Sequence, residues 1–223
     1  MKRTRPQLTA RPDAAVPGGE PGRHLLPGPA GHRDAVLVVP PGLTRPAALA
    51  VLMHGAGGNP QHVVSLLEPF AESHSVLLLG LASVGSTWDV LTGGFGPDVE
   101  RLDALLHDVF ARYPVDRVAV GGFSDGASYA LSVGIGNGDL FDAVLAYSPG
   151  FMAPAVQQGT PRVYISHGTA DRVLPVDRCS RRLVPTLERA GYDVTYDEFA
   201  GPHTVPPDVV ERSVTWWLGG ARD

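Results

Sequence analysis

The chain has 223 residues, 43% of them hydrophobic, which is enough to bury the core of one domain. Its 18 basic and 23 acidic residues leave a net charge of −5 without long runs of one sign, which argues against a nucleic-acid partner. Cys179 is the only cysteine, so an internal disulfide and a cysteine metal cluster are excluded.

Residues 1–33 are rich in Pro, Gly and Arg and show no apolar periodicity. We therefore expect a flexible N-terminal arm, followed by a single domain over residues 34–223. The start is basic but lacks the apolar core of a secretory signal, and no later run approaches the roughly 18 apolar residues of a membrane helix. These features predict a cytoplasmic protein without stable membrane association.

Short apolar runs and longer amphipathic runs alternate after residue 33, and the short runs are rich in Val, Leu and Ile with little polar alternation. This pattern is typical of a largely parallel sheet with helices on both faces. We expect helices to begin at Pro60 and Pro97 and to cover residues 176–191 and 206–220. The strands are expected at residues 34–39, 47–53, 75–80, 116–121, 141–146, 162–166 and 194–199. The predicted fold class is a three-layer α/β/α sandwich.

A G-x-S-x-G pattern lies at residues 122–126, directly after an apolar run and directly before a helical one. Glycines two residues on either side leave room for a tight turn that exposes the hydroxyl of Ser124. The alternative is a chance match in a glycine-rich chain. Because the pattern stands between a strand and a helix, we interpret Ser124 as a nucleophile.

A serine hydroxyl needs a base, and only His167 and His203 follow Ser124. His203 comes after the last predicted strand and before the last helix, which places it on a loop at the same sheet edge as Ser124. His167 ends the preceding strand, and we expect it to form the turn that presents Asp171. We therefore predict His203 as the base.

The acid that orients the base is expected between the serine and the histidine in the chain. Asp171 occupies a loop in that interval, and Asp177 is the alternative. A helix cap or an ion pair with Arg172 would also explain an aspartate at position 171. The order of the three residues favours Asp171 as the orienting acid.

A glycine-rich loop at residues 54–58 follows the strand predicted at 47–53. Its small residues let backbone N–H groups approach a substrate, so we expect an oxyanion hole formed by the N–H groups of Ala56 and Asp125. A phosphate-binding loop is the alternative, but Pro60 occupies the place of the third glycine and no Walker lysine is present. The eight histidines show no metal-ligand spacing, so we expect no metal and no cofactor.

Trp88 and Phe95 lie in a long loop over residues 83–96, which is expected to overhang the nucleophile. We predict that both side chains contact the acyl or alcohol part of a substrate, with simple hydrophobic anchoring of the loop as the alternative. Residues 149–161 are too few to form a cap domain over the site. The site should therefore be open to solvent.

With these residues in place, the chain resembles the phospholipase/carboxylesterase family of α/β-hydrolases, which includes small bacterial esterases and acyl-protein thioesterases. The resemblance covers residues 34–218 and rests on LMHGAGGN, GFSDGASYALSVG, YISHGTADRVLP and FAGPHTVPP, in this order. It implies an α/β-hydrolase fold and an oxyanion contact at Ala56, where thioesterases of the family often have Leu. Dienelactone hydrolases share the fold but use a cysteine nucleophile, so they are disfavoured.

The resemblance implies a serine carboxylesterase that cleaves small or accessible esters through an acyl-enzyme on Ser124. Its expected partner is a small-molecule ester, and the chain is expected to be a monomer or homodimer. Other enzymes remain open: an acyl thioesterase or lysophospholipase, or a polyester or feruloyl esterase. A peptidase of this fold usually carries an extra domain that admits peptides, and the sequence shows none, so a peptidase is disfavoured. The alternative outside enzymes is a catalytically dead hydrolase-fold protein that binds a ligand.

Overall fold

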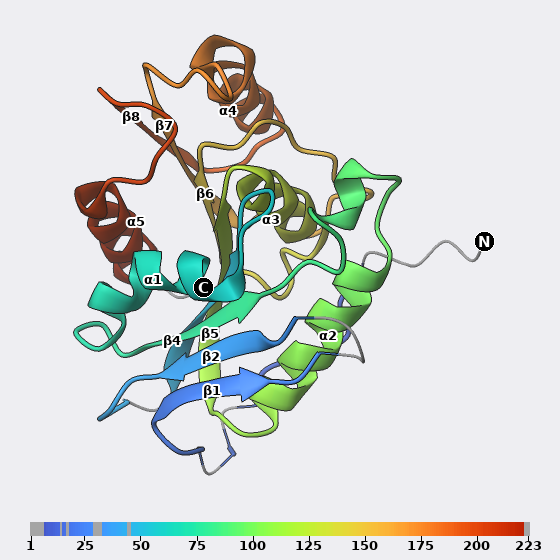
Figure 1. The fold of residues 1–223 in the computed structure, drawn as a ribbon, viewed down its shortest axis with the longest axis vertical. Coiled ribbons are helices and arrows are strands. Elements are labelled where there is room, and N and C mark those ends of the chain that lie inside the picture. The colour runs from blue at the N-terminus through green and yellow to red at the C-terminus, as the bar shows by residue number, and fades with distance from the viewer. Residues whose placement is uncertain (1–6, 14, 17, 29–32, 44–45, 221–223) are drawn as a thin grey trace.

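A single mixed sheet forms the centre of the computed structural model, which describes residues 7–13, 15–16, 18–28, 33–43 and 46–220 (Figure 1). The order of the strands across the sheet is β1-β2-β4-β3-β5-β6-β7-β8. The strands are β1 (Gly22–Leu26), β2 (Ala35–Val39), β3 (Ala47–Met53), β4 (Val76–Leu81), β5 (Val115–Phe123), β6 (Ala143–Tyr147), β7 (Arg162–Gly168) and β8 (Val194–Phe199).

Strand β2 runs antiparallel to both of its neighbours, β1 and β4, whereas all pairs from β4 to β8 are parallel. The carboxyl ends of the parallel strands therefore meet at one edge of the sheet. In open α/β sheets this is the edge where ligands bind. The loops that follow β3, β4, β5, β7 and β8 all lie there.

Five helices cover the sheet within the described residues: α1 (Pro60–Ala71), α2 (Pro97–Phe110), α3 (Asp125–Gly136), α4 (Ser180–Arg189) and α5 (Pro207–Gly219). Helices α2, α3 and α4 share one apolar core with the sheet, and α1 and α5 share a second core on the opposite face. Figure 1 shows these two groups on either side of the strands. The predicted three-layer α/β/α sandwich is confirmed.

The central strand β3 shows why the sheet lacks polar alternation. Leu49, Val51 and Met53 belong to the core on the α2 and α3 side, while Ala50 and Leu52 belong to the core on the α1 and α5 side. Because side chains of a strand alternate between the two faces, both sets must be apolar when helices cover both faces.

Helix α1 begins where the sequence predicts. The side chain of Asn59 accepts the backbone N–H of His62 at 2.9 Å, and Pro60 occupies the first turn. The helix buries Val63 and Leu67 against the sheet. Its first turns thereby lie beside the loop that follows β3.

The expectation of a flexible arm over residues 1–33 is wrong for two stretches of the described part of that range. Gly22–Leu26 forms the edge strand β1, and Leu8 and Ala10 are buried. The backbone N–H of Ala10 donates to Asp103 of α2 at 2.9 Å. This segment shows no apolar periodicity because most of β1 is exposed, and within the strand only Leu26 is buried. Residues 1–6, 14, 17 and 29–32 lie outside the described residues.

Strand β6 leads into β7 through residues 148–161, which contain no helix and pair with the segment before β6 only through an isolated bridge of Gly159 with Gly138. No cap domain therefore covers the carboxyl edge from this segment. None of the helices in the described ranges has the length and apolar character that crossing a membrane requires.

Candidate active site

Ser124 occupies a strained turn between the last residue of β5 and the first residue of α3. Its φ of 58° and ψ of −120° lie where residues with a Cβ atom are rare. Two backbone hydrogen bonds hold this conformation: the Ser124 N–H donates to Tyr147 at 2.9 Å, and the Ser128 N–H donates to the Ser124 carbonyl at 3.1 Å. The turn is anchored to β6 and to its own helix.

The flanking glycines are required by close backbone contacts. A Cβ atom on Gly122 would lie 2.5 Å from the carbonyl oxygen of Met53, and one on Gly126 would lie 2.1 Å from the same oxygen. Both distances are far below van der Waals contact. The G-x-S-x-G spacing therefore reflects direct packing of the turn against the end of β3.

Replacing Gly126 with Ala is expected to destabilise the protein, by roughly 1–3 kcal/mol or more, because the backbone of β3 cannot move aside as a flexible side chain could. Urea unfolding followed by circular dichroism measures this change. Gly136→Ala in the same helix is the matched control, since a Cβ atom there meets only Val156 O at 3.6 Å. Equal unfolding midpoints for the two variants would contradict the prediction.

The three residues predicted from chain order lie together at the carboxyl edge. His203, between β8 and α5, places Nε2 3.0 Å from Ser124 Oγ and Nδ1 2.5 Å from Asp171 Oδ2. The ring of Phe123 packs against the His203 ring with centroids 4.6 Å apart. Side chains from three separate loops thus form one hydrogen-bonded chain.

The carboxylate of Asp171 is fully buried and uses both oxygens. Oδ1 accepts the backbone N–H groups of Val173 and Leu174, each at 2.8 Å, while Oδ2 faces His203. Burial opposes ionisation, but the N–H of Leu174 and the His203 ring outweigh it and hold the pKa of Asp171 below its usual value. Asp171 therefore caps its own turn and also orients His203. Asp177, the alternative acid, is exposed and pairs with Arg181 instead.

His167 lies behind this turn. Its Nε2 atom is 2.8 Å from the Leu174 carbonyl and 3.2 Å from Asp171 Oδ2, and Nδ1 is 2.7 Å from Ser180 Oγ. A carbonyl only accepts, so Nε2 carries the hydrogen and Nδ1 accepts from the Ser180 hydroxyl. Burial lowers the pKa of His167, which favours this neutral form. His167 thus holds the turn that presents Asp171.

The loop at residues 54–58 lies directly beside the serine. A Cβ atom on Gly55 would be 3.3 Å from Ser124 Cβ. Gly57, with φ of 65°, donates its N–H to Ser86 at 2.9 Å, and Gly58 donates to Gly55 at 2.9 Å. These two bonds turn the loop tightly around the exposed residue Ala56.

Asp125, the other predicted donor, is the first residue of α3. The N–H groups of a first helical turn have no acceptor within the helix and carry the positive end of its dipole. The Asp125 side chain accepts the hydroxyl of Thr87 at 2.7 Å, so its position is held from the loop after β4. Asp125 thus follows Ser124 directly, and the loop that carries Ala56 lies beside Ser124 at Gly55.

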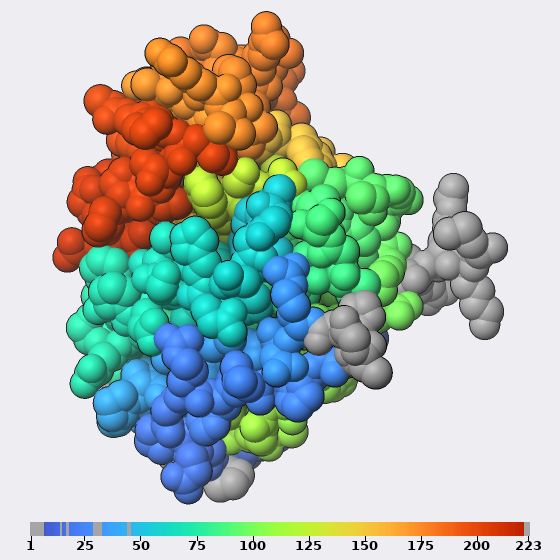
Figure 2. Space-filling model, in the orientation of Figure 1, coloured from blue at the N-terminus to red at the C-terminus, as the bar shows by residue number. Residues whose placement is uncertain are grey.

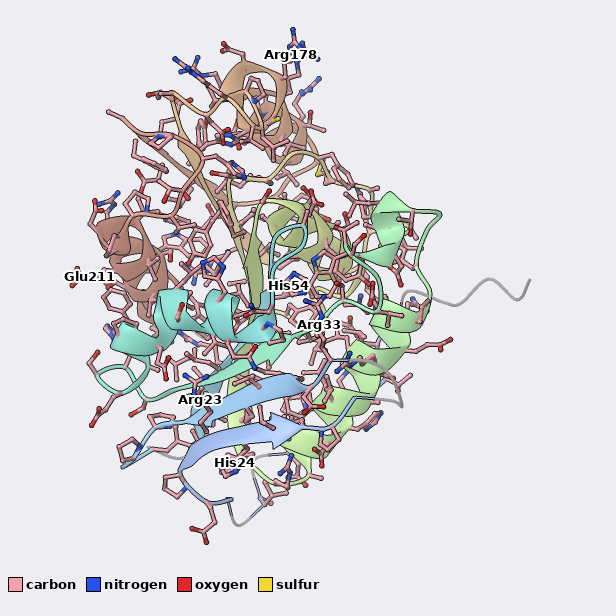
Figure 3. All side chains as sticks on the ribbon, viewed as in Figure 1. Arg23, His24, Arg33, His54, Arg178 and Glu211 are labelled. Atoms are coloured by element: carbon pink, nitrogen blue, oxygen red, sulfur yellow. The ribbon has the colours of Figure 1, made fainter. Side chains whose placement is uncertain are left out.

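His54 is a supporting residue that sequence reasoning missed. It is 2% exposed, donates from Nδ1 to the Gly55 carbonyl at 2.7 Å and accepts the N–H of Ser83 on Nε2 at 3.2 Å. Burial lowers its pKa, which favours the neutral ring that these bonds require. Arg33 donates to Gly58 and lies near His54 in Figure 3. In the sequence, the position of His54 directly before a glycine-rich loop could have indicated this supporting role.

The prediction that Trp88 contacts substrate is wrong, because its side chain is fully buried. The indole Nε1 donates to the His54 carbonyl at 2.8 Å, and the ring stacks on Tyr129 with centroids 4.9 Å apart. Trp88 thus anchors the loop at residues 54–58 through His54. Phe95 is half-buried, with its ring 6.0 Å from Tyr129.

Two further aspartates missed from the sequence hold the loop that carries Trp88. Asp98 accepts the N–H groups of Val84 and Asp89 at 2.7 and 2.8 Å, one on each oxygen. Asp89 in turn accepts the Asp98 N–H at 2.9 Å. Burial raises the pKa of both carboxyls. In the sequence, two aspartates on either side of a glycine-rich segment could have indicated this role.

A cleft of about 220 Å³ opens beside Ser124, between α1 and the loop that carries His203. On the face drawn in Figure 2, yellow-green atoms from the end of β5 and the start of α3 are framed by three other segments. These are the cyan loop after β3, the green loop after β4 and the red loop before α5.

The strand order, the strained serine turn after β5, the acid after β7 and the histidine after β8 together define an α/β-hydrolase fold. Solved structures share this fold. The crystal structure of esterase PE8 is 24% identical with a TM-score of 0.66, over 86% of this chain and 97% of that chain.

Acyl-protein thioesterase 2 of Zea mays is 21% identical with a TM-score of 0.62, over 83% of this chain and 97% of its own. FphF, a fluorophosphonate-binding serine hydrolase of Staphylococcus aureus, is 13% identical with a TM-score of 0.69, over 90% of this chain and 99% of that chain. No family model and no curated protein sequence matches the chain.

Proposed function

We propose that this protein is a serine carboxylesterase that hydrolyses small or accessible esters through an acyl-enzyme on Ser124. The hydrogen-bonded chain from Ser124 through His203 to the buried carboxylate of Asp171 carries the proposal. Solved structures with the same fold include an esterase and a carboxylesterase, which supports ester bonds as the substrate.

The first half of the reaction forms the acyl-enzyme. His203 Nε2 removes the proton of Ser124 as Oγ attacks the acyl carbon, and Asp171 stabilises the imidazolium through Nδ1–H. The N–H groups of Ala56 and Asp125 donate to the oxyanion that develops on the carbonyl oxygen. The C–O bond to the alcohol then breaks, and His203 gives its proton to the leaving oxygen.

The second half repeats these steps with water. His203 removes a proton from water, the resulting hydroxide attacks the acyl carbon, and the bond to Ser124 Oγ breaks as Oγ regains the proton. The same geometry would serve a thioester, and acyl-protein thioesterase 2 of Zea mays shares the fold. A thioesterase is therefore the second candidate.

Fluorophosphonate labelling tests the proposal, because only an activated serine reacts with this probe. We expect complete labelling of the wild-type protein at Ser124, located by mass spectrometry of peptides. His203→Ala should abolish labelling although Ser124 is present, and Ser65→Ala, at an exposed position of α1, should label fully. A wild-type protein that stays unlabelled would instead favour a hydrolase-fold binding protein.

Fluorophosphonate labelling does not show which acyl group or which type of ester the enzyme prefers. A panel of substrates measures this preference. Aryl esters from acetyl to palmitoyl, beside one thioester of matched acyl length, separate the carboxylesterase from the thioesterase. We expect higher kcat/KM for the short oxygen esters. A preference for the thioester would reject the carboxylesterase and retain the serine mechanism.

A further inference from the structure

The cleft beside Ser124 has a size that restricts what it can hold. Its volume of about 220 Å³ exceeds the roughly 150 Å³ of an apolar protein cavity that binds benzene. It falls below the roughly 300–1,000 Å³ of pockets for drug-sized ligands. One aromatic ring or a short alkyl chain therefore fits.

The chemistry of the proposed reaction determines which part of an ester faces this cleft. The tetrahedral carbon carries Ser124 Oγ, the oxyanion, the leaving oxygen and the acyl carbon. His203 Nε2 must protonate the leaving oxygen, so that oxygen must come within about 2.6–3.2 Å of it. The alcohol consequently extends along the side of His203.

The cleft lies on that side. Its lining includes His203, the next two residues Thr204 and Val205, and Phe123, whose ring contacts the His203 ring. The opposite wall is α1. We propose that this cleft is the leaving-group pocket and that it accepts compact, uncharged alcohols. The inference rests on the proposed esterase function.

The lining explains the preference for an uncharged alcohol. Four apolar side chains contribute to it: Val63, Leu66, Phe123 and Val205. Its titratable members are histidines, and no carboxylate, lysine or arginine is found among the described residues that line it. A charged alcohol would lose hydration without gaining a counter-ion.

Leu66→Trp tests the assignment by filling the cleft from the α1 wall, where Leu66 is half-buried. We expect the ratio of kcat/KM for benzyl acetate over methyl acetate to fall about tenfold or more, since even one methylene in an apolar pocket changes this ratio by that much. The ratio for methyl octanoate over methyl acetate should change less than about twofold. Ser65→Trp adds the same indole at an exposed neighbouring position and should leave both ratios unchanged.

Two outcomes would overturn the assignment. A fall in the octanoate ratio instead of the benzyl ratio would make the cleft an acyl pocket, and equal falls would show that it selects neither part. If circular dichroism shows that Leu66→Trp is unfolded, Val205→Trp fills the cleft from the opposite wall. Absence of labelling and of all ester hydrolysis in the wild-type protein would reject the esterase function itself.

Charge selectivity is tested with two acetates of nearly equal size, acetylcholine and its neutral analogue 3,3-dimethylbutyl acetate. We expect kcat/KM to be about tenfold or more higher for the neutral ester, because the cleft offers the cation no counter-ion. Equal or better hydrolysis of acetylcholine would show that the cleft does not select against charge.

Discussion

Replacing Ser124 with Ala is expected to lower kcat for ester hydrolysis at least about 10³-fold while the protein stays folded. The substitution removes only Oγ, which is the proposed attacking atom, and leaves the backbone bonds of the turn to Tyr147 and Ser128 intact. Residual turnover would come from the oxyanion donors and from binding. Steady-state hydrolysis of benzyl acetate measures the loss, and thermal unfolding verifies the fold.

Ser148 offers a closely matched control. It follows β6 at the same edge of the sheet, has a positive φ of 51° and is fully buried. Its hydroxyl has no hydrogen-bond partner among the described residues. Ser148→Ala should therefore retain activity, which separates loss of the nucleophile from a general effect of removing a hydroxyl from a strained turn. Comparable activity of Ser124→Ala and the wild-type protein would reject Ser124 as nucleophile.

Replacing Asp171 with Asn is expected to lower kcat about 10³- to 10⁴-fold, the size seen when the acid of such a triad becomes an amide. The two backbone N–H groups at Oδ1 should keep an oxygen of Asn in that place. The amide NH₂ group then faces His203 Nδ1 and donates to it. His203 would be held with its hydrogen on Nε2, where it cannot accept the Ser124 proton.

Asp177→Asn is the control for this substitution, because Asp177 was the alternative acid and pairs at the surface with Arg181. We expect unchanged kcat/KM in that variant and a free energy of unfolding within about 1 kcal/mol of the wild-type value, as is usual for a surface ion pair. A large loss of activity in Asp177→Asn, with Asp171→Asn fully active, would reverse the assignment of the orienting acid.

Local patterns in the sequence were sufficient to predict the layered architecture and the tight turn at Ser124. Strands that are covered on both faces must be apolar at every position, as β3 is. Such an apolar run can be recognised in the sequence without knowing which strands lie beside it. The glycines at 122 and 126 are likewise visible, because a turn this tight admits no Cβ atom. Chain order then selected His203 from the two later histidines, and chain order together with the family resemblance selected Asp171.

Contacts between distant segments were decided only by the tertiary structure. The sequence around a loop tryptophan is the same whether its indole faces substrate or, as in Trp88, is buried against His54 and Tyr129. Strand β1 carries little apolar signal because only its pairing with β2 makes it a strand. The cleft arises between α1 and the His203 loop, which are far apart in the chain. Periodicity and backbone sterics are local properties, whereas burial depends on which segments meet. The sequence by itself therefore predicted the reactive side chains at the carboxyl edge of the sheet. Only the tertiary structure showed which segments line the cleft beside them.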